Sequence, residues 1–478
     1  MSCLDAFPDA VPLYIRGQWT LSSRRLAAAS PFTGAPLPPV CACEDAQIAQ
    51  ALEAAAHAAP RVADMPARER AALICKAAAA VREAAAGLAR TMALETGKPV
   101  RDGLVEVLRS AETLELSAQE GLRIEGAHVP MESSAIGANK LGVSLRFPVG
   151  VVAAITPFNA PVNLTAHKLG PAWAAGNSVI LKPSPQSALT IHQFTQVLLA
   201  GGIPPYWLQV VQGDEAAAQM VRAPQVDFVS FTGSSRVGEI VKASSGLKRV
   251  ALELGGNGFT IVAADAVLEE AAQTCARNSM RLAGQSCISV QNVCVHRDLY
   301  EAFTRRVVHH VEKLRVGDPL DEATDVGTVI SAASAARIQA LVDAAIAAGA
   351  KLLCGGTHAG AVVQPTVLAD VPPHCQAVRG EVFGPVVSLL PYEDVRSVFD
   401  LINSGPYGLQ AGIYTESLPL AMRAMRSLRV GAVILNGSCT WRSDQAPYGG
   451  VKASGLGREG PRFAVREMTE ERFVVFNL

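Results

Sequence analysis

The run Val149-Gly-Val-Val-Ala-Ala-Ile155 decides the fold, because it is short, apolar and rich in valine and leads directly into the loop Thr156-Pro-Phe-Asn159. Segments with helical spacing separate it from similar short runs at Ser178–Leu181, Leu208–Val211, Asp227–Phe231 and Arg249–Leu252. Strands that alternate with helices in this way predict a doubly wound parallel sheet, with its ligands at the carboxyl ends of the strands. We therefore expect the functional residues in the loops that follow these strands.

The segment before this sheet is mostly helical. From Glu44 to Thr96 the sequence is rich in alanine with a helical period and stops at Gly97-Lys98-Pro99, so we predict two helices there. A further helix is predicted over Asp102–Leu122. Residues Arg123–Leu145 lose the helical spacing and are expected to form an extended excursion.

A second α/β region is predicted from Phe259 to Val433. Helices are expected near Leu268–Leu282 and Leu299–Leu314. Strands are expected near Val290–His296 and Val387–Leu390. This region should form a second domain.

The end of the chain has a strand without a partner nearby. Residues Glu471–Leu478 contain the β-type run Phe-Val-Val-Phe, and no adjacent segment is suited to pair with it. Because an unpaired strand exposes its backbone N–H and C=O groups, we expect it to add to a sheet edge elsewhere or on another subunit.

Length and charge restrict the architecture and the partners. A chain of 478 residues predicts two or more domains, since single cores rarely exceed about 250–300 residues. The 42 Lys and Arg residues are balanced by 43 Asp and Glu residues, for a net charge of −1. That balance does not favour binding to nucleic acid or to an anionic membrane, so a small molecule is the expected partner.

Three further features indicate a cytoplasmic protein. The stretch Met1–Tyr14 carries acidic residues where an export signal would have basic ones, and apolar runs such as Gly150–Ile155 are far shorter than the roughly 18–20 residues that span a bilayer. Ten cysteines are too few for a disulfide scaffold in a chain of this length. Cys41 and Cys43 stand two apart without a second pair or a histidine cluster, so no metal site is expected.

Cys287 is the candidate nucleophile, and by itself it is a weak one. It lies in Ala283-Gly-Gln-Ser-Cys-Ile-Ser289, a loop of small residues just after a predicted helix. A single cysteine beside glycine is more often a packing residue, because a reactive thiol needs access and a lowered pKa. Partners from other strand ends must therefore support a catalytic role.

Two such partners follow predicted strands. Asn159 comes after the strand that ends at Ile155 and offers an amide donor for an oxyanion, although a turn between prolines explains it equally well. Glu253 ends another strand and precedes Leu-Gly-Gly, whose glycines let a ligand approach the backbone closely. The alternative for Glu253 is an acid that caps the next helix.

One loop is suited to bind a pyrophosphate. Phe231-Thr-Gly-Ser-Ser-Arg-Val-Gly238 follows a strand and opens a helix, so its backbone N–H groups can meet an anion. The one literal GxGxxG match, Gly455-Leu-Gly-Arg-Glu-Gly460, has no preceding strand or βαβ unit and is discounted. Ser245-Gly-Leu-Lys248 matches the SxxK pattern of acyl-serine enzymes without its companion motifs and is interpreted as a loop at a helix end.

Together these segments resemble the aldehyde dehydrogenase superfamily. TPFN, LKPS, FTGS, ELGG, GQSC, EVFGP and PYGGVKASGLGREG occur in that family's order and approximate spacing over nearly the whole chain. The strings GQSCISVQ, GLQAG and TWRSDQAPYGG are most similar to the branch of lactaldehyde dehydrogenases and non-phosphorylating glyceraldehyde-3-phosphate dehydrogenases. The resemblance implies an α/β fold with a Rossmann-like cofactor domain, an α/β catalytic domain and an oligomerisation arm.

The resemblance also implies a role for each candidate. Cys287 would be the nucleophile, Asn159 and the Cys287 backbone N–H would hold the oxyanion, and Glu253 would activate the water that hydrolyses a thioester. The predicted reaction is the NAD(P)-dependent oxidation of an aldehyde to a carboxylic acid. The alternatives are a CoA-acylating semialdehyde dehydrogenase, which has less need of a hydrolytic base, and a catalytically silent binding protein with this fold.

Domain boundaries and partners follow from the same resemblance. It assigns residues 1–123 and 146–252 to an NAD(P)-binding domain, 253–433 to a catalytic domain, and 124–145 and 465–478 to an oligomerisation arm. It implies a homodimer or homotetramer, a small-molecule aldehyde as substrate, and NAD or NADP as cofactor.

Cofactor contacts are carried over from the resemblance position by position. The residues so assigned are Thr156, Pro157, Phe158, Lys182, Ser184, Gly213, Phe231, Gly233, Ser234, Val237, Leu254, Glu381 and Phe383. Many NAD-preferring members have a glutamate three residues after the lysine that corresponds to Lys182, where this chain has Pro185. Since that carboxylate binds ribose hydroxyls and repels a 2′-phosphate, the sequence leaves the choice between NAD and NADP open.

Four residues are candidates for contact with the substrate's tail. Members of the branch that act on phosphorylated aldehydes have three arginines there; Arg109 and Arg442 stand at the first and third positions, and Ser286 occupies the second. Two arginines instead of three predict that the substrate is a small aldehyde with a hydroxyl or an acidic group. The alternatives are a surface salt bridge for Arg109, a loop contact for Arg442, and a small apolar aldehyde against the ring of Trp441.

Overall fold

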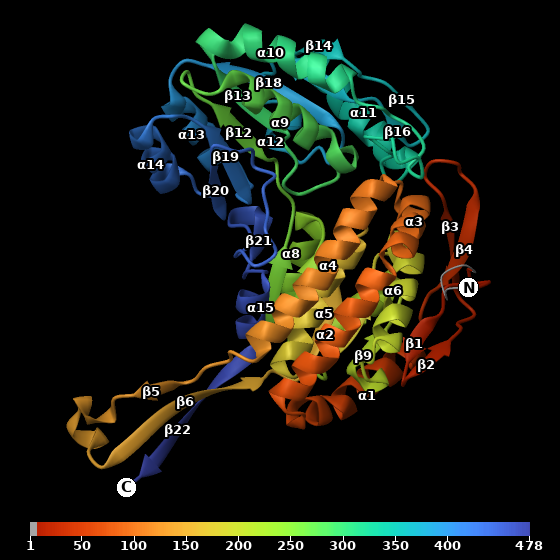
Figure 1. Ribbon diagram of the computed structural model, residues 1–478, viewed down its shortest axis with the longest axis vertical. Helices are drawn as coiled ribbons and strands as arrows, with labels where there is room; N and C mark the ends of the chain where they lie inside the picture. The colour runs from red at the N-terminus through yellow and green to blue at the C-terminus, as the bar shows by residue number, and fades with distance from the viewer. Residues whose placement is uncertain (1–6) are drawn as a thin grey trace.

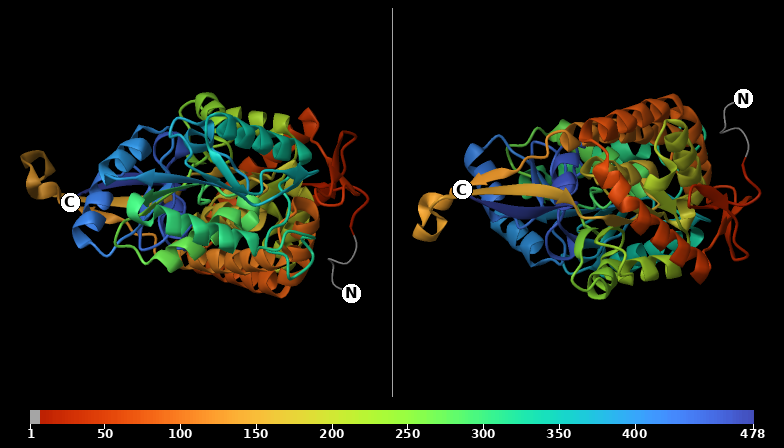
Figure 2. Two further views of the ribbon diagram at one scale, coloured as in Figure 1. Left: turned by 90° about the horizontal axis from the view of Figure 1, so that it is seen from above. Right: turned by 90° about the horizontal axis from the view of Figure 1, so that it is seen from below.

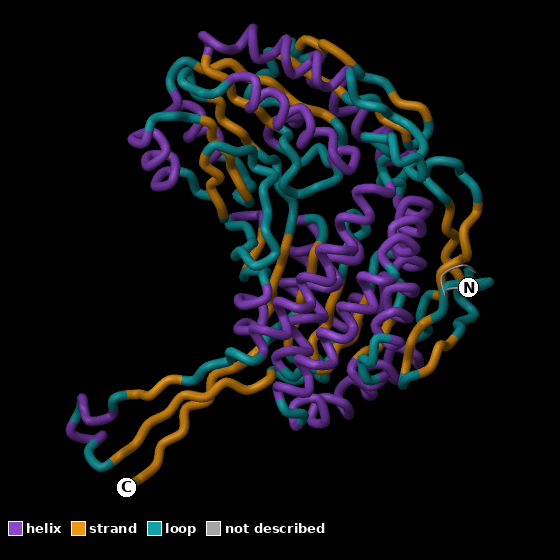
Figure 3. The backbone as a smooth tube through the Cα atoms, viewed as in Figure 1, coloured by secondary structure: helices purple, strands orange, loops and turns teal. Residues whose placement is uncertain are grey.

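A computed structural model describes residues 7–478 of the chain (Figure 1). Residues 1–6 lie outside the described residues. They are the beginning of the stretch Met1–Tyr14, in which we expect no export signal. The described chain forms two large sheets with helices on their faces and a projecting arm (Figures 1 and 3). Within residues 7–478, no helix combines the length and the apolar character needed to cross a membrane.

The first sheet contains the five strands that the sequence predicts. Its strands are β1 Leu13–Ile15, β2 Gln18–Thr20, β7 Val151–Ile155, β8 Ser178–Lys182, β9 Leu208–Val210, β10 Phe228–Thr232, β11 Arg249–Glu253 and β21 Gly455–Leu456. Their order is β2-β1-β9-β8-β7-β10-β11-β21. The five from β9 to β11 pair in parallel, which confirms the predicted doubly wound sheet.

Helices cover both faces of this sheet. They are α1 Asp45–Asp64, α2 Ala67–Glu83, α3 Ala85–Thr96, α4 Val100–Gly121, α5 Pro161–Ala175, α6 Ala188–Ala200, α7 Asp214–Arg222, α8 Ser235–Ser244 and α15 Pro461–Glu467. Val152 and Ala154 of β7 pack in one core with α2, α4, α5 and α6. Val151 and Ala153 pack in another core with α1, α7 and α8. Because successive side chains of a strand point to opposite faces, a strand covered on both sides is apolar throughout.

The region Glu44–Thr96 contains three helices, so the prediction of two was wrong. The chain leaves the helical conformation at Pro66, which precedes α2, and again at Ala84 between α2 and α3. The φ and ψ of Ala84 are −86° and 0°, in the bridge region outside the α-helical range. Alanine continues the apolar period across this break, so the sequence carries no signal for it. Helix α4 confirms the helix predicted over Asp102–Leu122.

The second sheet belongs to the second predicted α/β region. Its strands are β12 Phe259–Val262, β13 Asn292–His296, β14 Lys351–Cys354, β17 Thr366–Ala369, β18 Val386–Tyr392, β19 Gln410–Tyr414 and β20 Ala432–Leu435. The helices around it are α9 Leu268–Met280, α10 Arg297–Glu312, α11 Ala332–Ala347, α12 Gln376–Arg379, α13 Val395–Ser404 and α14 Leu418–Ser427. The order is β14-β17-β18-β13-β12-β19-β20, and only the pair β14–β17 is antiparallel. The predicted helices α9 and α10 and strands β13 and β18 are confirmed.

The arm is a sheet of β5 Ala127–Val129, β6 Lys140–Pro148 and β22 Thr469–Asn477. Strand β22 pairs antiparallel with β6, with Phe473 opposite Ser144, so the terminal strand adds to a sheet edge elsewhere in the same chain, as predicted. The arm and the N-terminal segment lie at opposite ends of both views in Figure 2. The remaining short elements are β3 Arg25–Ala29, β4 Pro36–Cys41, β15 His358–Ala359, β16 Val362–Val363, and the 3-10 helices η1 Met131–Ser133, η2 Ala135–Gly137, η3 Pro185–Ser187, η4 Pro205–Trp207, η5 Arg281–Gly284 and η6 Lys452–Ser454.

Candidate active site

A cavity of about 1080 Å³ contains the three candidate catalytic residues. Asn159 reaches it from the loop after β7, Glu253 from the end of β11, and Cys287 from the loop after η5. Two of the three therefore come from the carboxyl edge of the parallel sheet, where ligands bind in sheets of this kind.

The backbone before Cys287 makes an unusual turn. Leu282, Ala283 and Gly284 have φ values of 56°, 50° and 68°. Non-glycine residues seldom adopt positive φ, and those that do cluster at functional sites. A Cβ atom at Gly284 would lie 1.9 Å from the carbonyl oxygen of Gly384, so only glycine fits there. This turn ends the helical segment and presents Cys287 to the cavity.

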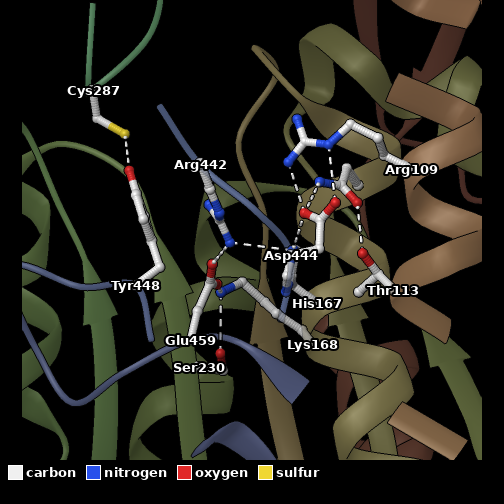
Figure 4. Close-up of polar contacts among 11 residues, drawn as sticks. Arg109, Thr113, His167, Lys168, Ser230, Cys287, Arg442, Asp444, Tyr448 and Glu459 are labelled. Atoms are coloured by element: carbon white, nitrogen blue, oxygen red, sulfur yellow. Dashed lines mark hydrogen bonds and ion pairs between the residues drawn. The ribbon is translucent and has the colours of Figure 1, made fainter. Parts of the chain in front are cut away.

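The surroundings of Cys287 disfavour the thiolate. Burial raises the pKa of the thiol to about 12, and the carboxyl groups of Glu381 and Glu253 act in the same direction. The Sγ atom lies 2.9 Å from the hydroxyl oxygen of Tyr448, and this hydrogen bond lowers the pKa (Figure 4). In this arrangement Cys287 is therefore a thiol at neutral pH, and ionising it requires help from its neighbours.

Asn159 is tied to the loop that carries Cys287. Its Nδ2 atom donates a hydrogen bond to the carbonyl oxygen of Gln285 at 2.9 Å. Gln285 is itself anchored, because its Oε1 atom accepts from the backbone N–H of Ile330 at 2.8 Å. The Asn159 amide is thus held as a donor facing the segment two residues before Cys287.

Glu253 is a buried carboxyl group with an unused oxygen. Burial raises its pKa well above the ordinary value, and the negative charge of Glu459 raises it further. Its Oε2 atom has no hydrogen-bond partner among the described residues. A Cβ atom at Gly449 would lie 2.9 Å from its Oε1 atom, so a glycine there leaves room for the carboxyl group. A buried acid with a raised pKa in a cavity is typical of a general base.

Arg109, one of the candidate substrate residues, is paired with Asp444. Its Nε and one terminal nitrogen donate to the two carboxylate oxygens at 2.9 and 2.7 Å. His167 contacts this carboxylate at 3.0 Å (Figure 4), and Asn163 contacts it at 3.2 Å. Although burial opposes ionisation, His167 and Arg109 hold the pKa of Asp444 far below its ordinary value.

Arg442, the other candidate arginine, is also paired. A terminal nitrogen lies 3.1 Å from Glu459 and 3.2 Å from His167. Lys168 on α5 also donates to Glu459, at 3.1 Å (Figure 4). Burial opposes the ionisation of Glu459, yet Lys168 and Arg442 outweigh it and lower its pKa. Both arginines line the cavity, with Ser286 and Trp441, but neither is free of a protein carboxylate.

Seven residues assigned to the cofactor line the same cavity. They are Pro157, Phe158, Gly233, Ser234, Leu254, Glu381 and Phe383. The rings of Phe158 and Phe383 meet edge to face with centroids 6.1 Å apart. Glu381 accepts from the backbone N–H of Gly256 at 3.0 Å, and burial raises its pKa to about 7.

The other six assigned residues lie outside the cavity, at or near the carboxyl edge of the first sheet. They are Thr156, Lys182, Ser184, Gly213, Phe231 and Val237. Ser234 caps α8 by accepting from the N–H of Val237, which leaves the helix N-terminus beside Gly233 suited to an anion. A Cβ atom at Gly233 would lie 2.5 Å from the buried ring of Phe231, so glycine keeps this approach open. These features fit a dinucleotide.

Sequence reasoning missed five residues of the site: Tyr448, His167, Lys168, Asp444 and Glu459. Tyr448, Asp444 and Glu459 stand inside strings that identify the family but assign no role to these residues. His167 and Lys168 lie on α5, which is buried along its whole length. These two adjacent titratable residues stand in a helix of mostly apolar residues. Because a buried charge requires a partner, the pair is a signal in the sequence that a polar site lies nearby.

Comparison with known proteins shows the family of the chain. The model of the aldehyde dehydrogenase family matches residues 19–474. A 3-sulfolactaldehyde dehydrogenase of Priestia aryabhattai is 41% identical over 468 residues, which cover 98% of each chain. A lactaldehyde dehydrogenase of Methanococcus vannielii is 36% identical over 97% of this chain and 100% of its own. The solved NADP complex of the NADP-dependent glyceraldehyde-3-phosphate dehydrogenase from Bacillus halodurans C-125 has a TM-score of 0.95 at 33% identity, over 98% of this chain and 99% of that one.

The chain belongs to the aldehyde dehydrogenase family. It is an NAD(P)-dependent aldehyde dehydrogenase, and the predicted likeness to the lactaldehyde and glyceraldehyde-3-phosphate dehydrogenase branch is confirmed. The predicted α/β fold with this family's architecture is confirmed as well.

Proposed function

We propose that Cys287 is the nucleophile of this dehydrogenase and forms a thioester with the substrate. The observation that supports it is the meeting of Cys287, Asn159 and Glu253 in one cavity from three separate elements. The thiolate adds to the aldehyde carbon, and the amide of Asn159 with the backbone N–H of Cys287 stabilises the oxyanion that forms on oxygen.

The second half of the reaction belongs to Glu253. When bound, NAD(P) accepts the hydride that leaves the substrate carbon, which leaves an acyl group on Cys287. Glu253 takes a proton from water, the water oxygen attacks the thioester carbon, and the carbon–sulfur bond breaks to return the thiolate. Since a general base works best with a pKa near the operating pH, the raised pKa of Glu253 suits this step.

We propose that the cofactor lies along the carboxyl edge of the first sheet. The N-terminus of α8 at Ser234 would hold the pyrophosphate, because unpaired N–H groups and the helix dipole favour an anion there. Lys182, at the end of β8, would contact the adenosine ribose. Glu381 and Phe383 would contact the nicotinamide end inside the cavity.

We propose a small aldehyde with a hydroxyl or a single acidic group as the substrate. Two sequence relatives support this class, since one is named a 3-sulfolactaldehyde dehydrogenase and the other a lactaldehyde dehydrogenase. Two arginines of the cavity wall support it too, because Arg109 and Arg442 both line the cavity. A guanidinium group that remains partly exposed, as that of Arg109 does, is suited to a carboxylate or sulfonate.

The test is a panel of aldehydes with NAD or NADP, with and without CoA, followed by the absorbance of the reduced cofactor. Reduction without CoA supports the hydrolytic reaction. A requirement for CoA would indicate the acylating alternative, and binding of cofactor without reduction by any aldehyde would indicate a silent binding protein.

We also propose that the arm joins subunits of a homodimer or homotetramer, with the domain boundaries given above and a cytoplasmic location. The arm's exposed apolar side chains support this: Ile136, Leu141, Leu145, Phe473, Val475, Phe476 and Leu478. An apolar surface of this kind is typical of an interface. Light scattering should give a mass of two or four chains, and substituting Asp for both Phe473 and Phe476 should lower it.

A further inference from the structure

The hydroxyl group of Tyr448 faces the sulfur atom of Cys287, and it has no place in the reaction proposed above. We infer that Tyr448 is a further catalytic residue, which donates a hydrogen bond to the Cys287 thiolate while Arg442 polarises its ring. The inference rests on the proposed role of Cys287 as the nucleophile.

The geometry of Tyr448 is suited to this role. Its hydroxyl oxygen lies 2.9 Å from Sγ, within the range of a hydrogen bond to sulfur (Figure 4). The side chain is 5% exposed and packs with Ile288 and Leu409. Its backbone is fixed by a pair of hydrogen bonds with Glu459, at 3.0 and 2.6 Å. The phenol is therefore held beside the sulfur before any substrate binds.

Arg442 makes the phenol a stronger donor. Its guanidinium carbon lies 3.8 Å from the centre of the Tyr448 ring, and Glu459 holds the guanidinium in place at 3.1 Å. A cation over an aromatic ring stabilises negative charge that shifts from the phenol oxygen into the ring, so the O–H group becomes a stronger hydrogen-bond donor. The positive charge also acts directly in favour of a thiolate at Cys287.

The other charged groups that face Cys287 oppose the thiolate. They are the carboxyl groups of Glu253, at the end of β11, and Glu381, in the loop before β18. Among the described residues, Tyr448 is the side chain that is hydrogen-bonded to Sγ. Because its own pKa is raised well above the ordinary value by burial and by the charge of Cys287, Tyr448 keeps its proton when the thiol ionises. The thiol proton passes to solvent in the cavity, and the phenolic hydrogen turns toward sulfur.

The experiment measures the ionisation of Cys287 without turnover. The intact enzyme is alkylated with iodoacetamide over a range of pH, and the Cys287 peptide is quantified by mass spectrometry. The alkylation rate should rise with pH through an inflection at the pKa of the Cys287 thiol. In Tyr448→Phe this inflection should move up by about one pH unit or more, so at a fixed pH below it the alkylation rate should be about tenfold lower. Tyr392→Phe is the matched control, since Tyr392 is buried and donates to Val262 at 3.2 Å in the second sheet; its inflection should match the wild type.

A second variant keeps the shape of the ring. Tyr448→3-fluorotyrosine has a more acidic phenol, so the inflection should move down relative to the wild type. An unchanged inflection in both Tyr448 variants would overturn the inference. The proposed function would then still stand if Cys287→Ala abolished turnover, whereas retained turnover in Cys287→Ala would overturn the function itself.

Discussion

The carboxylate of Asp444 accepts two parallel hydrogen bonds from the guanidinium of Arg109, at 2.9 and 2.7 Å. The pair joins α4, beside the first sheet, to the loop that follows β20 of the second sheet. Asp444 also lies 3.0 Å from His167 on α5. One buried carboxylate therefore fixes three elements of the cavity wall.

Asp444→Asn should lower the free energy of unfolding by about 1.5–3 kcal/mol, because it replaces charge-assisted hydrogen bonds with neutral ones. Equilibrium unfolding in urea would measure this change in the free energy of unfolding. Glu393→Gln breaks an ion pair with Arg297 that is largely exposed and should cost less than about 1 kcal/mol. Since folding lowers the pKa of Asp444, its stabilising effect is present at neutral pH and is lost as pH falls below the ordinary range of an Asp. Equal losses for the two variants would contradict a structural role for Asp444.

Arg109→Ala should change substrate preference. Its side chain is 33% exposed at the cavity, compared with 11% for Arg442, so Arg109 is the better placed to meet an acidic tail. The wild type should favour succinic semialdehyde over butanal by about tenfold or more in kcat/KM, and Arg109→Ala should lose most of that preference.

The control for substrate preference is Arg101→Ala, since Arg101 lies on the same helix and pairs with Asp325 outside this cavity. Arg442→Ala should lower kcat/KM for both aldehydes alike, because Arg442 acts on the Tyr448–Cys287 pair. Equal efficiencies for the two aldehydes in the wild type would refute an acid-directed site.

The preference of the enzyme for NAD over NADP should be modest. Pro185 supplies no carboxylate beside Lys182, but the structure places Asp214 3.2 Å from the ammonium group of Lys182. The Asp214 side chain is 96% exposed, so solvent and salt screen its repulsion of a 2′-phosphate. Asp214→Asn should tighten NADP binding about tenfold or less and leave NAD binding unchanged, as fluorescence titration would show. A preference of the wild type for NAD above about a thousandfold, or roughly 4 kcal/mol, would contradict this weak discrimination.

Glu253→Gln should separate the two halves of the reaction. The thiol and the oxyanion donors remain, so rapid mixing should show one fast equivalent of reduced cofactor followed by slow turnover. Because folding raises the pKa of Glu253 and the base must be ionised, kcat of the wild type should increase with pH through that pKa. Loss of the burst in Glu253→Gln would instead assign Glu253 to thiol activation or to structure.

The sequence predicts the parallel sheet and the meeting of Asn159 with Glu253, because strands buried on both faces are continuously apolar and their carboxyl ends share an edge. It does not predict the pair of Arg109 and Asp444, which are 335 residues apart and belong to no shared pattern. The sequence does not predict the contact between Tyr448 and Cys287 either, since a motif identifies a family but does not show which side chains face each other.

The most direct test of the thioester mechanism is detection of the covalent intermediate itself. Glu253→Gln is mixed with aldehyde and NAD(P), quenched in acid at the end of the burst, digested, and analysed by mass spectrometry. The thioester mechanism predicts one acyl group per chain on the Cys287 peptide and none on the peptide of Cys439, a buried cysteine that donates toward Ile288 beside it. A full burst of reduced cofactor with no acyl group on Cys287 would contradict the thioester mechanism.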